Sequence, residues 1–377
     1  GSAVAVTVIA IAAVWLTRRG PAAGAATPAG ETATRTIAVL PFGNGGDTAN
    51  AYFSDGMTEE LTVSLARIPG LVVRAHSSAM TLRGKSIREA GAKLNVDALI
   101  EGSARQSGGR VRVNASLVQV SDEAVLWSGT FQRESKDLFA VEDSIANAIA
   151  AALRITLTST AHARLSVPST QSPEAHDAYL RAKYQVARGG ERDLRQALVL
   201  YQRVLTLDSA FAPAWAGIAD VWSDLADDWV APRDGYARAE DAVHRALALD
   251  STLAEANAAL AEVHLWYSWD FAAVEREALR AITRNPSLAD AYTMYALAMS
   301  FRGHTDSAVA LVQRARSLDP LSAGVTAELA RVLLYGDRYD AAVAASRVAS
   351  SLDADFSLAH FFAGQALLAK GQPREAL

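Results

Sequence analysis

The sequence predicts an α+β protein in which a small mixed α/β domain precedes an all-helical array of repeats, with a transmembrane helix remnant at the N-terminus. Three observations predict this architecture. Residues 1–19 are mostly apolar, residues 36–160 alternate between strand-like and helix-like patterns, and residues 173–377 contain a turn that recurs about every 34 residues. A chain of 377 residues, 50% of them hydrophobic, is long enough for two such domains.

The composition excludes several classes of function. The net charge of −5 comes mainly from residues 166–377, which carry net −7, whereas residues 36–165 carry net 0. No segment has the excess of Lys and Arg that binding to a nucleic acid backbone needs, so we expect no nucleic acid partner. The absence of cysteine rules out disulfides and thiolate nucleophiles, and no two of the seven His have metal-ligand spacing. We therefore expect no metal site and no cofactor.

The N-terminus predicts a membrane anchor. An uncharged run, "AVAVTVIAIAAVWL", ends just before Arg18-Arg19, and it is shorter than the roughly 20 residues that span a bilayer. Because the chain does not begin with Met, we interpret residues 1–19 as the end of a transmembrane helix. A signal-peptide core and a buried soluble helix are the alternatives. Residues 20–35 are rich in Pro, Ala, Gly and Thr, which is typical of a linker.

The anchor implies a single-pass membrane protein. We expect its soluble part to be periplasmic or otherwise extracytoplasmic. The pair Arg18-Arg19 taken alone favours a cytoplasmic C-terminal side under the positive-inside rule, and that rule compares both flanks of a helix. The side of the membrane therefore stays open at this point.

Residues 36–160 predict the element order β-α-β-α-β-β-β-α. A short strand, "TIAVLPF", is followed by a helix whose apolar residues are spaced by 4, 4, 4 and 3 positions. A second strand and a second helix (86–95) precede two runs around the turn "SGG", the second of which alternates between apolar and polar residues, and these predict a hairpin. A third alternating run and a final helix complete the domain. The stripe of the first helix consists of Phe53, Met57, Leu61, Leu65 and Ile68.

That first helix begins with "SDGMTEELT", which places three carboxylates within six residues. Convergent carboxylates could perform acid/base chemistry, which needs both groups within reach of one proton. On a helical wheel, however, Asp55 and Glu59 lie opposite the apolar stripe, and Glu60 lies at its rim. We therefore expect the first two to form a solvated helix face, and we predict no catalytic residues.

Two glycine-containing stretches resemble phosphate-binding loops. "RGKS", 83–86, matches the end of a P-loop, but position 79 is Ala where that motif needs Gly, so a polar loop is the better interpretation. "GNGGD", 43–47, lies between a strand and a helix, where backbone amides could hold an anion. An ordinary flexible connection is the alternative for the second stretch.

Together, "IAVLPF", "YFSDGMTEELTVSLARIPGLVVRAHSS", "LIEGSARQSGGRVRVNASLV" and "LWSGTFQRESKDLFAVEDSIA" resemble the TolB N-terminal-like domain over about residues 36–157. That resemblance implies a non-catalytic domain of bacterial signalling proteins, placed after a transmembrane helix and before tetratricopeptide repeats. Members of the family are fused to Ser/Thr kinases, nucleotide cyclases or CadC-like winged-helix regulators.

The repeat array follows from the turns "LTLDSA", "LALDST", "ITRNPS", "SLDPLS" and "SLDADF", which are separated by 42, 35, 34 and 34 residues. A 34-residue period of paired helices is typical of tetratricopeptide repeats. The longer first gap places about eight extra residues near "DDWVAPRDG", 227–235. We expect five to six repeats over residues 173–377, the last of them cut short.

Stacked repeats of this kind form a superhelix whose first helices line a concave groove. The first helices share a motif that starts at Trp215, Asn257, Tyr292, Thr326 and His360, with a small residue four positions later. In known repeats, the residue five positions after the start of this motif faces that groove. We predict a groove for a protein or peptide ligand, without the basic clamp that would hold a C-terminal carboxylate. The predicted groove residues are Asp220, Glu262, Leu297, Arg331 and Gln365.

The aromatic run "LWYSWDF", 265–271, has two interpretations. Its helical spacing favours the core, and a binding surface is the alternative.

The whole pattern predicts a non-enzymatic, membrane-tethered sensor or scaffold segment of a bacterial signalling protein. The alternative is the C-terminal regulatory part of a receptor-type Ser/Thr kinase, an adenylate cyclase or a CadC-like regulator, with its output domain upstream of residue 1.

Overall fold

The computed structural model describes residues 35–46, 51–134, 138–155, 170 and 172–376. The expected transmembrane helix and nearly all of the expected linker lie outside these residues. Among the residues that are described, no helix is both long and apolar enough to cross a membrane. Residues 35–377 make up one compact unit.

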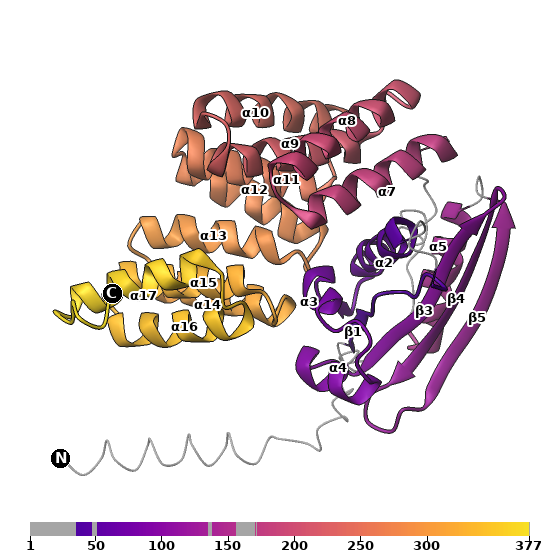
Figure 1. Cartoon of the computed structure of the whole chain (residues 1–377), viewed down its shortest axis with the longest axis horizontal. Coiled ribbons are helices and arrows are strands. Elements are labelled where there is room, and N and C mark those ends of the chain that lie inside the picture. Colours follow the sequence, from indigo (N-terminus) through magenta and orange to yellow (C-terminus); the bar gives the residue numbers. More distant parts are fainter. Residues whose placement is uncertain (1–34, 47–50, 135–137, 156–169, 171, 377) are drawn as a thin grey trace, which may run out of the picture. The chain divides into compact units, whose positions relative to one another are not determined.

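The α/β part is built on a five-stranded sheet with the order β2-β1-β3-β4-β5 (Figure 1). Strand β1 runs parallel to β2 and β3, whereas β3, β4 and β5 form an antiparallel meander. Every expected element is present in the expected order, with one additional helix, α3, between β2 and α4. Its bounds are β1 Arg35–Val39, α2 Ala51–Ala66, β2 Leu71–Val73, α3 His76–Met80, α4 Ile87–Leu94, β3 Ala98–Ser107, β4 Arg110–Gln119, β5 Val125–Glu134 and α5 Leu138–Ala152.

One element was missed. Helix α3 is only five residues long, which is too short to produce a helical apolar period.

Helices cover both faces of the parallel part of the sheet. Ile37 and Val39 of β1 belong to the same core as helices α2 and α5, whereas Ala38 between them packs with α4. This alternation places successive side chains of one strand on opposite faces. All five residues of the predicted apolar stripe are at most 1% exposed; four of them lie on α2, and Ile68 lies two residues past its end.

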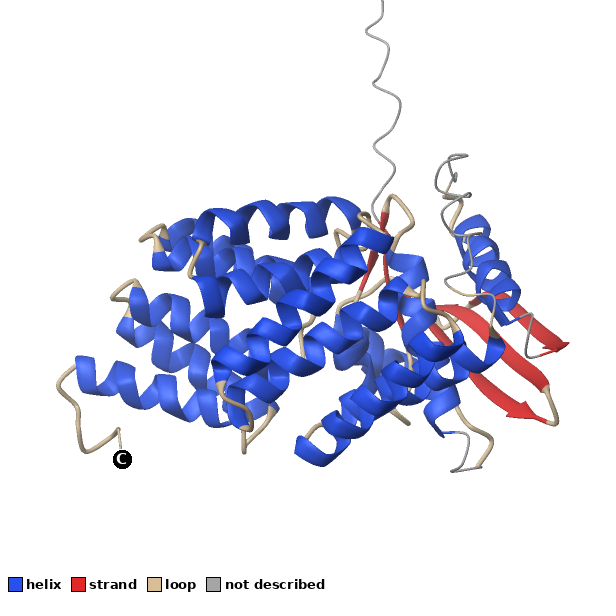
Figure 2. Cartoon of the chain, turned by 90° about the horizontal axis from the view of Figure 1, so that it is seen from above, coloured by secondary structure: helices blue, strands red, loops and turns tan. Residues whose placement is uncertain are grey.

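The repeat part consists of antiparallel helix pairs, and Figure 2 shows it as helices joined by short loops. The pairs are α7 Pro173–Arg188 with α8 Glu191–Leu207, α9 Ala212–Asp228 with α10 Pro232–Leu249, α11 Ala254–Val263 with α12 Phe271–Arg284, α13 Ala289–Phe301 with α14 Thr305–Leu318, and α15 Ala323–Tyr335 with α16 Tyr339–Leu352; α17 is Ser357–Ala369. A π-helix, η3 His264–Ser268, continues α11.

The small residues that recur in the first helices are fully buried, at 0% exposure for Ala219, Ala261, Ala296 and Ala330. A methyl group at these positions lets neighbouring helices approach closely.

The two irregular repeat lengths have different structural causes. Helices α9 and α10 have 17 and 18 residues, against 13 and 14 in α13 and α14, so the eight extra residues extend both helices of one pair. The 35-residue repeat contains the π-helix η3, in which Trp269 N donates to His264 O five residues earlier. A π-helix accommodates one extra residue per turn, which accounts for the single-residue excess.

We predict that Ala261→Leu will lower the free energy of unfolding by about 1–3 kcal/mol, since added methylenes in a packed core force the neighbours apart. Urea denaturation measures the change. Ala272→Leu, on the exposed side of α12, is the matched control and should leave stability nearly unchanged. Equal stability of the two variants would contradict the close-packing role of Ala261.

Candidate functional site

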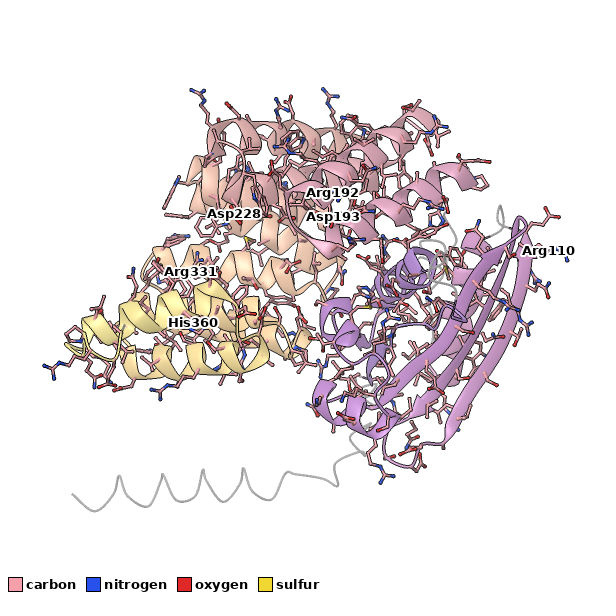
Figure 3. All side chains as sticks on the ribbon, viewed as in Figure 1. Arg110, Arg192, Asp193, Asp228, Arg331 and His360 are labelled. Atoms are coloured by element: carbon pink, nitrogen blue, oxygen red, sulfur yellow. The ribbon has the colours of Figure 1, made fainter. Side chains whose placement is uncertain are left out.

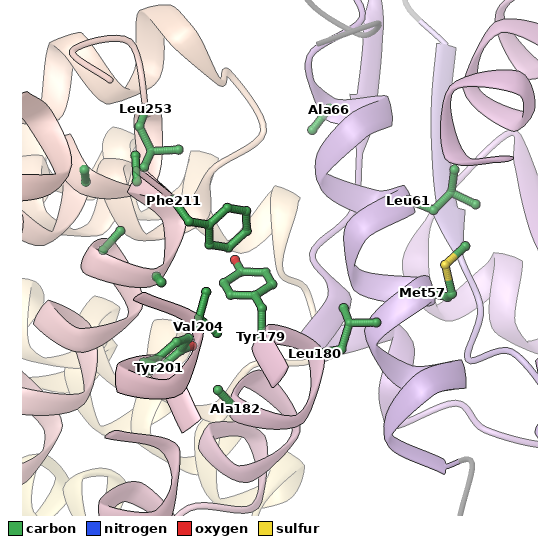
Figure 4. Close-up of a cluster of buried hydrophobic side chains, with 14 of the residues drawn as sticks. Met57, Leu61, Ala66, Tyr179, Leu180, Ala182, Tyr201, Val204, Phe211 and Leu253 are labelled. Atoms are coloured by element: carbon green, nitrogen blue, oxygen red, sulfur yellow. The ribbon is translucent and has the colours of Figure 1, made fainter. Parts of the chain in front are cut away.

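The candidate site begins with the contact between α2 and α7. Figure 4 shows Leu180 of α7 pointing toward α2, and this side chain is 0% exposed. It packs against Gly56, where a Cβ atom would lie 2.8 Å from Leu180 Cδ2. A glycine is therefore needed at this position for the two helices to reach the observed separation.

Polar contacts flank this apolar centre. Lys183 Nζ lies 2.6 Å from Glu59 Oε1, and both side chains are 24% exposed. Burial raises the pKa of Glu59, but the Lys183 ammonium outweighs that effect, so the net pKa is lowered. At the other end, Tyr52 Oη donates to Asp177 Oδ1 at 2.6 Å and accepts from Arg181 at 2.7 Å.

The expectation for "SDGMTEELT" is therefore only half right. The first two carboxylates lie opposite the apolar stripe, as expected, but that face is not solvated. Glu59 is paired with α7, and Asp55 forms an ion pair with Arg83 at 2.5 Å with 17% of its side chain exposed. A helical wheel identifies an apolar face, but it cannot show that a polar face meets a partner of opposite charge.

A second contact joins the α/β part to the turns between repeats. Ala75 N donates to Leu318 O at 2.8 Å, and Val73 N donates to Ser287 Oγ at 3.2 Å. Asp319 accepts hydrogen bonds from the hydroxyls of Ser77 and Ser78. Residues 73–78 thus lie along two successive turns of the array. Their hydrogen bonds fix the position of α3 beside the repeats.

These two contacts enclose a cleft of about 960 Å³. One wall comes from α2, β2 and α3, and the other comes from α7, α9, α11 and α13. Eight carboxylates line it, against three Lys or Arg side chains and His76. The Nδ1 atom of His76 is buried in the wall without a hydrogen-bond partner among the described residues.

Five of the eight carboxylates make no hydrogen bond or ion pair with a described residue. They occupy equivalent positions in successive repeats, since Asp220 and Glu262 are 42 residues apart and Glu255 and Asp290 are 35 apart, which match the repeat lengths. The fifth, Asp224, follows Asp220 by one helical turn. The cleft therefore presents a row of carboxyl groups without cationic partners.

Crowding of these carboxylates changes their protonation. Burial and repulsion from Asp224 raise the pKa of Asp220 to about 8. Burial, followed by repulsion from Asp220 and Asp224, also raises the pKa of Glu262 well above its ordinary value. A cationic ligand would relieve both effects.

The other predicted groove residues lie in different surroundings. Leu297 is 1% exposed and offers no surface to a ligand. Arg331 lies between the rings of Trp266 and Phe362, at 5.1 and 4.9 Å, and pairs with Glu328 at 3.1 Å. Gln365 is exposed on α17. The sequence pattern thus identified two residues of the cleft, Asp220 and Glu262, and missed its second wall.

The aromatic run combines both of its interpretations. Leu265 is fully buried, as expected for core, whereas Trp269 is 57% exposed. The Trp269 ring lies 6.0 Å from Phe301, which in turn lies 5.8 Å from Tyr335. The rings therefore form a partly exposed cluster at the ends of the first helices.

The side chains of "RGKS" bond within the α/β part, which agrees with a polar loop. Arg83 pairs with Asp55, Lys85 pairs with Glu89, and the Ser86 hydroxyl caps α4. In "GNGGD", Gly43 N donates to Gly102 O and Gly46 N donates to Asn44 Oδ1. Asp47 lies outside the described residues, so anion binding there stays a hypothesis. Within the described residues, no cluster of His, Asp and Glu side chains has the arrangement of a metal site.

Comparisons with known proteins find a matching family model, one curated relative and several solved structures. Residues 33–148 match the model of the second domain of HilA/YgeH-like transcriptional regulators. The chain is also 33% identical over 205 residues to "Putative adenylate cyclase 3" of Rhizobium meliloti (strain 1021). That alignment covers 54% of this chain and 35% of the relative, so the chain spans about a third of the length of the curated protein it matches. The family model differs in name from the TolB N-terminal-like resemblance, which stays an interpretation.

Solved structures similar to the chain include proteins described as tetratricopeptide (TPR) proteins. The protein YrrB is 20% identical with a TM-score of 0.35, covering 57% of this chain and 98% of YrrB. A thermophilic repeat protein of Thermus thermophilus, TTC0263, is 18% identical with a TM-score of 0.44, covering 52% and 99%. The type IV pilus biogenesis factor PilW is 16% identical with a TM-score of 0.44, covering 54% and 88%. The repeat fold of this chain is carried by its own helix pairs and their 34-residue spacing.

We predict that Lys183→Met will lower the free energy of unfolding by about 1–3 kcal/mol, because it leaves the Glu59 carboxylate unpaired in the α2–α7 contact. Chemical denaturation measures the loss. In the double variant Glu59→Gln/Lys183→Met, much of the stability should return, since no charge is then left unpaired. A double variant as unstable as the single one would show that the ion pair is not the cause.

We also predict that stability falls as the pH rises through the range set by Asp220. Its folded pKa of about 8 exceeds the ordinary 3.8, so the folded state binds this proton more tightly. The stabilising contribution is complete below about pH 4 and is lost as the pH rises through about 8. In thermal unfolding followed across this range, Asp220→Asn should show a shallower pH dependence than the unmodified chain. Asp241→Asn, exposed on α10, should retain the steeper slope.

Proposed function

We propose that this chain is a non-enzymatic regulatory segment of a bacterial signalling protein, and that its cleft binds a protein segment rich in Lys and Arg. The observation that carries the proposal is the row of five uncompensated carboxylates in a cleft with walls from two parts of the fold. A cleft of about 960 Å³ admits several side chains of an extended segment. Cationic side chains would neutralise the carboxylates and lower their elevated pKa values.

The same groove disfavours the opposite ligand charge. Lys183 is already paired with Glu59, and Arg188 lies 3.3 Å from Asp193. An acidic segment would therefore meet repulsion in the cleft, where unfavourable charge pairs suppress binding of the wrong partner. Titration of Asp220 near neutral pH would make affinity for a cationic segment increase with pH.

The output domain of the parent protein is a separate proposal. The 33% identity to the relative named "Putative adenylate cyclase 3" supports the alternative in which the chain is the C-terminal regulatory part of a cyclase. The matched family model supports the alternative in which it is the regulatory part of a transcription regulator. A receptor-type kinase has only the TolB N-terminal-like resemblance in its favour. Membrane tethering through residues 1–19, with an extracytoplasmic soluble part, also remains a proposal. The sequence of the complete gene tests the choice of output domain, and protease accessibility of the chain in intact cells tests the side of the membrane.

We predict that a fluorescently labelled peptide of alternating Lys and Ala will bind the chain, and that its Glu/Ala counterpart will not. Fluorescence anisotropy at low salt measures both affinities. Affinity should fall as ionic strength rises, because exposed charges are screened. The double variant Asp220→Asn/Glu262→Gln should weaken binding by about tenfold or more, since each lost charge pair contributes on the order of 1 kcal/mol.

The control for this experiment is Asp228→Asn/Asp241→Asn, which removes two exposed carboxyl groups outside the cleft, the same number as the test variant. It should bind the Lys/Ala peptide with nearly unchanged affinity. Equal weakening in the two double variants would indicate attraction to the overall negative charge of the repeats and would refute the cleft as the binding site.

A further inference from the structure

Strand β5 forms one edge of the sheet and is ten residues long. Among the described residues, it pairs with β4 alone. The opposite edge is formed by β2, which has only three residues and is covered, because Val73 N donates to Ser287 Oγ of the repeats. The β2 edge of the sheet is therefore short and covered by the repeats, whereas the β5 edge is long and has no such cover among the described residues. Figure 1 shows β5 on the outer side of β4.

β5 also lacks the features that usually protect an edge strand. Protected edges are short, carry Lys or Pro, or are bent by bulges. Residues 125–131, "VLWSGTF", contain neither a charged residue nor Pro. The side chains of Val125 and Leu126 are 61% and 40% exposed at the start of the strand. The one bulge in the β4–β5 ladder lies at Leu117/Val118, next to that same end.

Opposite charges lie at the two ends of β5. The C-terminal end of β5 carries Arg133. Its neighbours on β4 are Arg110, which pairs with Glu134, and Arg112, which pairs with Gln132. Figure 3 shows Arg110 at the free end of the hairpin, pointing away from the sheet.

At the N-terminal end, Asp122 and Glu123 form the exposed turn that leads into β5. Arg88 of α4 lies 3.2 Å from Glu123, but this pair is exposed, so solvent weakens it. One end of the strand is therefore basic and the other acidic.

We propose that β5 is the contact surface for a second copy of this chain, which adds its own β5 in antiparallel orientation and forms a continuous ten-stranded sheet. A two-fold axis through the middle of the strand is the symmetry of such a contact. It places the basic end of each β5 beside the acidic end of the other. In the register that sets Glu123 opposite the partner's position 133, Ser128 lies opposite its own counterpart on the axis. The same register sets Asp122 opposite position 134, where Glu134 pairs with Arg110 of β4.

The charges at the two ends of β5 favour a second copy of this chain, rather than a strand of another protein, as the partner of β5. A strand from another protein would need the reverse charge order by coincidence, whereas antiparallel pairing of β5 with itself supplies that order automatically. Opposite charges placed directly across an antiparallel pair stabilise it, and the exposed start of the strand gains apolar contact as well. The contact lies on the sheet, away from the α2–α7 docking surface, so it is independent of ligand binding in the cleft.

The test compares self-association of the 377-residue chain with that of Leu126→Lys by sedimentation equilibrium. We expect a concentration-dependent dimer whose dissociation constant rises about tenfold or more in the variant, because a Lys on an edge strand opposes pairing. Leu249→Lys, at an equally exposed apolar site on α10, is the matched control and should dimerise like the unmodified chain. Unchanged circular dichroism and melting temperature will show that each variant folds.

A second arm uses the absence of native cysteine. Ser128→Cys places one thiol on the proposed axis, within the roughly 7 Å between Cα atoms that a disulfide can bridge. It should form a disulfide-linked dimer on mild oxidation. Ser116→Cys, its neighbour on β4, lies one strand further from the axis and should not. A monomer at all concentrations, a dimer unaffected by Leu126→Lys, or equal cross-linking of both Cys variants would each overturn the proposal.

Discussion

The docking of α2 onto α7 is the contact on which the rest of the candidate site depends. The apolar face of α2 completes the core of the α/β part, and its opposite face meets the first helix of the array through Gly56, Leu180 and the Glu59–Lys183 ion pair. Because α2 belongs to both contacts, the sheet and the repeats are held at a fixed separation. The cleft exists only at that separation, since each of its walls is otherwise an open surface.

Acidic and aromatic side chains overlap along the array. The unpaired carboxylates lie in the second, third and fourth pairs of helices, from Asp220 of α9 to Asp290 of α13. The Trp269, Phe301 and Tyr335 cluster extends from the third pair to the fifth, and Arg331 of the fifth pair lies between the rings of Trp266 and Phe362. The third and fourth pairs therefore carry both kinds of side chain.

Most of the fold could be predicted from the sequence, because its elements are encoded locally. The stripe of α2, the alternation in β3–β5 and the recurring turns of the array are patterns within one element or one repeat. The α2–α7 contact could not be predicted, since it joins residues about 125 positions apart and consists of one glycine, one leucine and one ion pair. Periodicity predicts on which face of the helix Glu59 lies. Whether that face contacts water or Lys183 depends on where α7 packs, which periodicity does not predict.

The site was predicted in part for the same reason. Asp220 and Glu262 follow from the repeat register, and Asp290 belongs to a second register position that the single-position rule omitted. Leu297 occupies the same repeat position as Asp220, yet its side chain is buried. The repeat position does not by itself determine exposure, because an apolar side chain packs against its neighbours where a carboxylate stays in contact with water. The π-helix could be recognised as an extra residue in one repeat, although its place within that repeat could not.

A cleft with one wall from each part of the fold has a thermodynamic consequence. Any molecule that touches both walls binds the docked arrangement more tightly than an undocked one, so its binding free energy adds to the cohesion between sheet and array. A change that loosens the α2–α7 contact weakens the apparent affinity of that molecule in proportion to the fraction of chains that are no longer docked. Binding in the cleft and docking of the α/β part onto the repeats are thus thermodynamically linked, and measuring either one reports on the other.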